Sequence, residues 1–140
     1  MEDKEQHPLV GRTSTQSMTV DAQVVADFAK ATGDHNPLHL DEEFAGQTRF
    51  GRCIAHGMIG ASLISAVIGN KLPGQGTVYR KQDLAFKRPV FIGDEITARV
   101  EVLEELPKKH TYRLKTTVSN AAGEVVIDGA AEIYFKGEAS

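Results

Sequence analysis

Residues 56–70 contain no aspartate, glutamate, lysine or arginine and read HGMIGASLISAVIGN. Their side chains are small or apolar all round, and a helix without a polar face has to be buried on every side. Gly69 and Asn70, followed by Pro73 and Gly74, indicate where such a helix stops. We therefore expect a buried helix over about Gly57 to Asn70, and the rest of the chain has to cover it.

The chain after this helix has the character of strands separated by glycines and turns. The expected strands span residues 77–86, 94–106, 111–119 and 124–135. Turn residues at 106–109 and 120–123 predict hairpins between the last three of them. A sheet that curls around one apolar helix buries that helix along its length. The predicted class is therefore α+β, with a curved antiparallel sheet wrapped around a long central helix.

The first part of the chain is less regular. Residues 1–8 are polar and typical of a flexible tail, and residues 10–14 are compatible with a short edge strand. Thr19 is a plausible N-cap for an amphipathic helix that ends at Gly33, and Asp41 to Ala45 predicts a short helical turn. The expected apolar face of the amphipathic helix consists of Val20, Val24, Phe28 and Ala31.

Composition limits the number of domains and the kinds of partner. A chain of 140 residues with 41% hydrophobic and 25% charged residues fits one globular domain over residues 1–140. The net charge is −3 and the positive residues are dispersed, so we expect neither nucleic acid nor a membrane as partner. A single cysteine and an acidic N-terminus predict a cytoplasmic protein. Because a long exposed edge strand is removed by pairing, a homodimer is expected.

The most concentrated group of polar side chains lies in residues 33–39, which read GDHNPLH. Glycine permits a left-handed turn and proline restricts the residue before it, so we expect a fixed irregular loop. If the loop directs Asp34 and His39 to one point, a carboxylate and an imidazole can hold a water molecule and move its proton. Asn36 would then orient His39, the water or a substrate amide. Alternatively, Asp34 and Asn36 only form turns, and His39 is a structural loop histidine.

The start of the apolar helix, at His56 and Gly57, is a second candidate. Free N–H groups at a helix N-terminus stabilise negative charge such as an oxyanion on a carbonyl, and glycine lets a substrate approach. The alternative is that Gly57 serves only the turn.

Other kinds of chemistry are less well supported by the pattern. Asp34, His35, His39 and His56 are ligand types for a metal. However, proline between the first two histidines prevents a helical i, i+4 presentation, so no metal is expected. Neither Ser62 nor Ser65 lies in a Gly-x-Ser-x-Gly elbow, and Cys53 has no activating neighbour in the sequence, so a nucleophilic mechanism is not expected.

Residues 28–39 and 54–58 resemble the hydratase 2 motif of the MaoC-like dehydratases. The two segments read FAKATGDHNPLH and IAHGM, and residues 86–94, FKRPVFIGD, also look like a segment of that family. The resemblance covers residues 20–135, and the layout is most similar to the short, single-domain (R)-specific enoyl-CoA hydratases. It implies a hot-dog fold, a homodimer, and reversible addition of water to trans-2-enoyl-CoA to give (R)-3-hydroxyacyl-CoA.

The resemblance also implies roles for individual residues. Asp34 and His39 match the catalytic pair, Asn36 a supporting polar residue, Gly57 the N–H donor to the thioester carbonyl, and Ser65 an auxiliary serine. No cofactor is implied, because the thioester itself activates the substrate. Cations that could bind coenzyme A phosphates are Arg12, Lys81, Lys87 and Arg88, and each is equally compatible with a solvated surface charge.

Three alternatives to the acyl-CoA hydratase remain at this point. The chain could dehydrate 3-hydroxyacyl groups on acyl carrier protein or a specialised small acyl-CoA. It could be a hot-dog thioesterase, which shares the fold but hydrolyses the thioester. It could also be a non-catalytic subunit that binds acyl thioesters without turnover.

Overall fold

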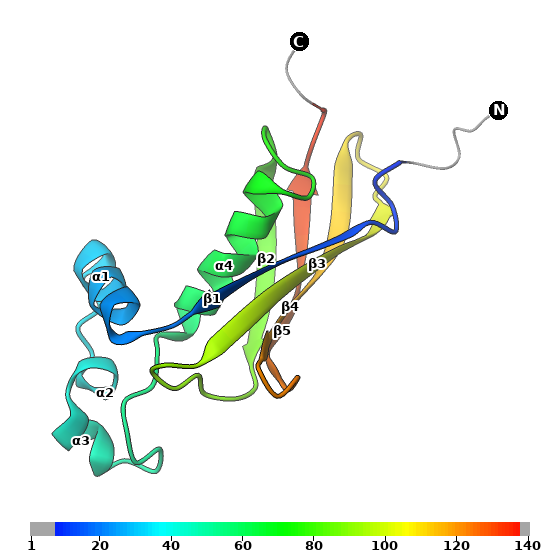
Figure 1. The fold of residues 1–140 in the computed structure, drawn as a ribbon. Coiled ribbons are helices and arrows are strands. Elements are labelled where there is room, and N and C mark those ends of the chain that lie inside the picture. The colour runs from blue at the N-terminus through cyan, green and yellow to red at the C-terminus, as the bar shows by residue number, and fades with distance from the viewer. Residues whose placement is uncertain (1–7, 138–140) are drawn as a thin grey trace.

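The computed structural model describes residues 8–137, and the first seven residues of the predicted tail lie outside this range. Figure 1 shows the order of the elements along the chain. They are β1 (Thr13–Thr19), α1 (Ala22–Thr32), α2 (Pro37–Leu40), α3 (Glu42–Gly46), α4 (Gly57–Asn70), β2 (Val78–Phe86), β3 (Glu95–Glu105), β4 (Thr111–Asn120) and β5 (Val125–Tyr134).

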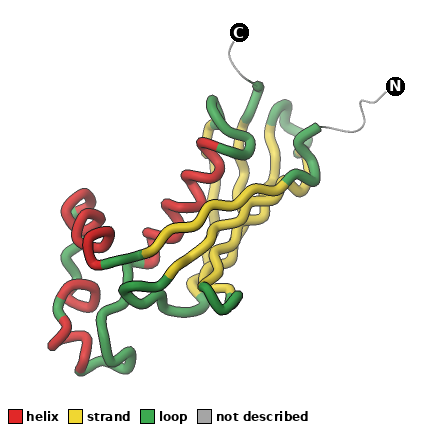
Figure 2. Tube along the Cα trace, viewed as in Figure 1, coloured by secondary structure: helices red, strands yellow, loops and turns green. Residues whose placement is uncertain are grey.

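The five strands form one antiparallel sheet in the order β1-β3-β4-β5-β2. The helix α4 lies along one face of this sheet, and α1, α2 and α3 gather at the end where α4 begins (Figures 1 and 2). The four strands expected after the helix are confirmed within two residues at each end. The arrangement is the α+β, hot-dog architecture that the sequence predicted. Among the described residues, no helix has the length and apolar character needed to cross a bilayer.

The core lies between α4 and the sheet. Alternate residues of β3, namely Ile96, Ala98, Val100 and Val102, are buried, and they pack in one cluster with Leu63, Ile64, Val67 and Ile68 of α4. Each of these valine, leucine and isoleucine side chains contributes about 1.5–3 kcal/mol when it leaves water. The predicted helix of residues 57–70 is therefore confirmed as the element around which the core is built.

The expectation that this helix is buried on every side is wrong for the single chain. Met58, Ser62, Ser65 and Gly69 are exposed along one side of α4. The sheet covers only the side of the helix that carries the large aliphatic residues. The remaining side consists mainly of small residues and stays open in one copy of the chain.

The start of α1 also differs from the expectation. Thr19 is the last residue of β1, and Asp21 is the N-cap, with its side chain accepting a hydrogen bond from the Val24 N–H. The helix buries Val25 and Ala29, whereas Ala31 is exposed. The strand extends to Thr19 because it pairs with β3 along its whole length, and this long-range pairing overrides the local preference of threonine for an N-cap.

The expected irregular loop contains a short helix. Pro37–Leu40 forms α2, with Asn36 as its N-cap and the proline at its first turn. Proline suits this position because its missing N–H would have no helical partner there and its φ is already helical. Thus Pro37 starts the local structure that carries His39. The predicted turn at residues 41–45 is confirmed as α3, for which Asp41 is the N-cap.

Candidate active site

Two consecutive side-chain turns position the residues after α1. Gly33 ends α1 in the left-handed conformation with φ 81°. The Asp34 carboxylate accepts a hydrogen bond from the Asn36 N–H (3.2 Å), and the Asn36 side-chain oxygen accepts one from the Leu38 N–H (3.0 Å). The His39 N–H donates to the Asn36 carbonyl (3.0 Å). Asn36 therefore supports the turn that carries His39.

A backbone contact fixes the tautomer of His39. The Nδ1 atom of His39 lies 2.7 Å from the carbonyl oxygen of Ile54. A carbonyl can only accept, so Nδ1 carries the hydrogen and, in the neutral ring, Nε2 keeps its lone pair. His39 is half-buried and is thus arranged to accept a proton through Nε2.

The side chains of Asp34 and His39 come together, as the sequence predicted. A carboxylate oxygen of Asp34 and one ring nitrogen each of His39 and His56 all lie within 4.8 Å of one another. A water molecule with hydrogen bonds of about 2.8 Å can bridge two atoms separated by this distance. Asp34 is exposed, so its carboxylate is open to water.

His56 is the residue of this cluster that was not assigned a side-chain role from the sequence. It is 3% exposed, and its Nε2–H donates to the Asp34 carbonyl oxygen at 3.0 Å. Its ring packs against His39 with a centroid distance of 4.0 Å and against Phe28 at 4.9 Å. His56 thus links the loop that carries Asp34 to the start of α4. Its Nδ1 is buried without a hydrogen-bond partner among the described residues.

The same three residues are of the types that bind metal ions, but their spacing fits poorly. Four ligands around zinc, at bonds of about 2.0–2.1 Å, lie about 3.4 Å apart, whereas these donor atoms spread over as much as 4.8 Å. One nitrogen of each imidazole is also engaged by a backbone carbonyl. His35, considered as a ligand from the sequence, is not part of the group. The absence of a metal remains a prediction.

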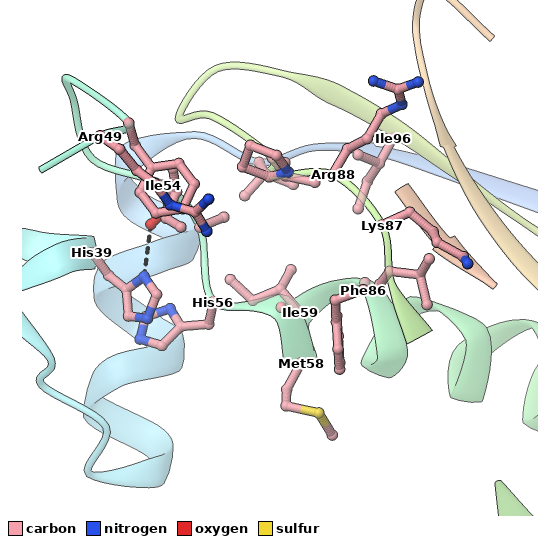
Figure 3. Close-up of a pocket in the computed structure, with 18 residues that line it drawn as sticks. His39, Arg49, Ile54, His56, Met58, Ile59, Phe86, Lys87, Arg88 and Ile96 are labelled. Carbon is pink, nitrogen blue, oxygen red and sulfur yellow. Dashed lines mark hydrogen bonds between the residues drawn. The ribbon is translucent and has the colours of Figure 1, made fainter. Parts of the chain in front are cut away.

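Gly57 is the first residue of α4 and borders a pocket of about 460 Å³ (Figure 3). Within the described residues, the N–H groups of Gly57 and Met58 donate to no backbone or side-chain acceptor. These N–H groups form the positive end of the helix dipole, which favours a negatively charged group bound in the pocket. A Cβ atom at Gly57 would lie 2.8 Å from the Phe86 ring, so a larger residue at this position would displace the ring.

The walls of the pocket are mainly aliphatic, with His39 and His56 at one side (Figure 3). Apolar lining comes from Val20, Ile54, Ile59, Ile96 and Ile127, and cationic lining from Arg49, Lys87 and Arg88. Ser65 does not line the pocket and is exposed on α4, about 12 Å along the helix from Gly57. Its predicted auxiliary role thus has no counterpart in the geometry of a single chain.

Cys53, next to the pocket, is shielded. Burial raises the pKa of its thiol, and the neighbouring Glu42 carboxylate raises it further. Both effects disfavour the reactive thiolate at neutral pH. We expect a thiol reagent such as dithionitrobenzoate to react with Cys53 slowly in the native protein and fast in denaturant. A native rate equal to the denatured rate would contradict this.

Comparison with known proteins identifies the family of the chain. The model of the MaoC like domain matches residues 5–125, and the chain belongs to that family. The chain is 48% identical over 122 residues to the 3-hydroxybutyryl-CoA dehydratase of Methylorubrum extorquens, covering 87% of this chain and 77% of that protein. It is 44% identical over 124 residues to the (R)-specific enoyl-CoA hydratase of Aeromonas caviae, covering 89% and 92%. The unliganded R-hydratase of Pseudomonas aeruginosa superposes with a TM-score of 0.87 at 45% identity, covering 92% and 83%.

Proposed function

We propose that the protein is an (R)-specific enoyl-CoA hydratase, a lyase that adds water reversibly to trans-2-enoyl-CoA to give (R)-3-hydroxyacyl-CoA. The observation that carries the proposal is the short distance between the Asp34 carboxylate and the His39 imidazole, which have an oxygen and a nitrogen within 4.8 Å of each other. They lie beside a pocket that is also lined by Gly57, whose N–H is free. The enzymatic names of the relatives support the same reaction and the (R) configuration.

The proposed mechanism uses the pair to activate one water molecule. Asp34 and the unprotonated Nε2 of His39 each accept a hydrogen bond from the water, and Nε2 takes a proton as the oxygen attacks the β-carbon. Electrons of the carbon–carbon double bond move toward the thioester, whose oxygen becomes negative. The N–H groups of Gly57 and Met58 stabilise that oxygen.

The second half of the reaction returns the proton. The proton taken by His39 passes through the Asp34–His39 pair to the α-carbon, so that one H and one OH are added in total and the pair is restored. No cofactor has a role in this scheme, because the thioester carbonyl withdraws the electrons. The cytoplasmic location predicted from the sequence is kept as part of the proposal.

A paired assay tests the proposed function. With crotonyl-CoA as substrate, hydration lowers the absorbance of the conjugated thioester without release of thiol, and chiral analysis of the product should give the (R) enantiomer. Stoichiometric thiol release would establish a thioesterase instead. Turnover of crotonyl-acyl carrier protein without turnover of crotonyl-CoA would favour the carrier-protein dehydratase. Binding without turnover of either substrate would favour the non-catalytic subunit.

We also propose that the protein is a homodimer formed through the edge of the sheet at β2. This strand has one free edge and exposes Val78 and Tyr79, while Phe86 and Met58 are exposed where β2 ends beside the start of α4. A second copy would bury these apolar side chains and satisfy the free edge.

The dimer has a direct test. Sedimentation should give twice the 15.2 kDa mass of the chain. Val78→Asp should shift the protein toward monomer, because it places a charge in the apolar contact. Leu103→Asp, at an exposed apolar residue of β3, is the matched control and should leave the mass unchanged. A wild-type monomer, or equal effects of the two variants, would exclude this interface.

A further inference from the structure

A second groove lies on the face of the sheet that points away from α4. It has a volume of about 580 Å³ and is lined by Lys87, Arg88, Lys115, Thr117, Val125 and Asp128. Tyr112, Leu114, Thr116 and Val118 of β4 are buried, so the alternate residues Lys115 and Thr117 face the other way. We infer that this groove binds the phosphorylated nucleotide end of coenzyme A while the acyl thioester occupies the pocket at Gly57.

The groove and the pocket share a short stretch of chain. Lys87 and Arg88 line both, and their N–H groups donate to the Val126 carbonyl at 2.8 and 3.4 Å. These bonds hold the stretch against β5. In Figure 3, Lys87 and Arg88 lie on the side of the pocket opposite His39. A thioester with its carbonyl at Gly57 can therefore extend its pantetheine arm past Lys87 into the groove.

The charges of the groove are available for an anion. Within residues 8–137, Lys87 and Lys115 form no ion pair, and Arg88 has only a 3.8 Å pair with Glu124 in which both side chains are about half exposed. Such exposed pairs contribute little and are easily exchanged. The lining of the groove therefore contains three cations and one carboxylate, that of Asp128, with Glu124 beside Arg88, in a protein of net charge −3.

The mixture of side chains matches the nucleotide end of coenzyme A better than a simple anion. Lysine and arginine bind phosphate oxygens, and the Thr117 hydroxyl can donate to another of them. Asp128 lies directly across from Thr117 in the β4–β5 register. Its carboxylate can only accept, and the ribose hydroxyl and the adenine amino group offer the donors that it needs.

The structure also distinguishes among the cations that the sequence analysis named as candidates for binding coenzyme A phosphates. Arg12 immediately precedes β1, at the end of the sheet away from α2 and α3 (Figure 1), and Lys81 lies in the middle of β2. Neither lines the pocket or the groove. Arg49 lines the pocket, but its guanidinium packs over the Phe50 ring at 4.7 Å. Lys115 was not among the candidates and joins Lys87 and Arg88 only through the fold.

The inference rests on the proposed hydratase activity and is tested by comparing two thioesters in kinetics. Crotonyl-CoA carries the nucleotide, whereas the crotonyl thioester of N-acetylcysteamine lacks it. We expect Lys115→Ala and Lys87→Ala each to raise KM for crotonyl-CoA about tenfold, as loss of one charge-assisted contact predicts. In Lys115→Ala, whose side chain lines the groove and not the pocket, the kcat for crotonyl-CoA and the kinetics with the short thioester should be unchanged.

A control and a competitor sharpen the comparison. Lys109→Ala removes an exposed lysine from the β3–β4 turn, at the far end of the sheet, and should change no parameter. Adenosine 3′,5′-bisphosphate should compete with crotonyl-CoA in the wild type and lose at least tenfold in affinity in the Lys87→Ala/Lys115→Ala double variant. Equal changes with both thioesters, or no change with crotonyl-CoA, would overturn the inference. A KM effect confined to crotonyl-acyl carrier protein would also overturn it, in favour of a protein carrier.

Failure of the proposed function is distinguishable from failure of this inference. If the wild type hydrates neither thioester, the hydratase proposal fails. Calorimetric titration with coenzyme A then tests, without any assay of activity, whether the groove binds coenzyme A. Binding that weakens at least tenfold in the double variant supports the groove. Binding that is absent, or equal in wild type and variant, contradicts it.

Discussion

His39→Ala is expected to lower kcat/KM for hydration of crotonyl-CoA by about 10²–10⁴-fold, the usual contribution of a positioned acid–base group. The variant removes an imidazole that has one nitrogen within 4.8 Å of an Asp34 carboxylate oxygen. Asp34→Asn should have a loss of similar size. Its amide oxygen can still accept the hydrogen bond from the Asn36 N–H, so the loss reports the missing negative charge and not a collapsed turn.

The neighbouring histidine provides the control for this pair. His35 is exposed and lies outside the cluster of Asp34, His39 and His56, so His35→Ala should keep nearly full activity. All three variants should keep the wild-type circular dichroism spectrum and a cooperative melting transition. His39→Ala should lower the melting temperature by about 4 °C, because it loses the hydrogen bond to the Ile54 carbonyl and the packing against His56. Near-wild-type rates in His39→Ala and Asp34→Asn would refute the proposed mechanism.

Gly129→Ala should be the most destabilising conservative change in the sheet. Gly129 of β5 lies opposite Leu84 of β2, and a Cβ atom there would be 2.0 Å from the Asp83 carbonyl oxygen. The obstacle is backbone, so β2 itself has to move. We expect a loss of about 3 kcal/mol in the free energy of unfolding and a drop of about 10 °C in Tm.

A second glycine gives a control of opposite sign. Gly69 in the last turn of α4 is exposed, and a Cβ atom there would meet nothing within 4 Å. Gly69→Ala should therefore raise stability by about 0.5–1 kcal/mol through helix propensity alone. Both variants can be followed by urea unfolding. A Gly129→Ala protein as stable as the wild type would mean that β2 is not held at this distance from β5.

The elements that were predictable are those whose signals are local. The apolar run that begins at Gly57 is bounded by residues that stop helices, and the strands of the second half are bounded by glycines and hairpin turns, so their limits were found closely. The β1 strand was placed too early because its sequence, TSTQSMT, contains one apolar residue, Met18. Only its pairing with β3, some 80 residues later, defines it.

The same distinction applies to the site. Asp34 and His39 are five positions apart, and turn-forming residues between them made their approach predictable. The contact of His56 with the Asp34 carbonyl spans 22 positions. Lys115 of β4 and Lys87, which follows β2, line the same groove although β3 separates them in the sequence. No local sequence pattern indicates that these residues lie close together.

The two faces of β5 allow the acyl preference and the carrier preference of such an enzyme to change separately during evolution. Ile127 lines the pocket and Asp128, the next residue, lines the groove on the opposite face of the sheet. Under the two proposals, substitutions at neighbouring positions can change the acyl preference and the carrier preference independently, without touching the loop that carries out the chemistry. An insertion or deletion of one residue within β5 would exchange the faces and disturb both preferences at once. Inherited length changes should therefore be confined to the turns that flank this strand.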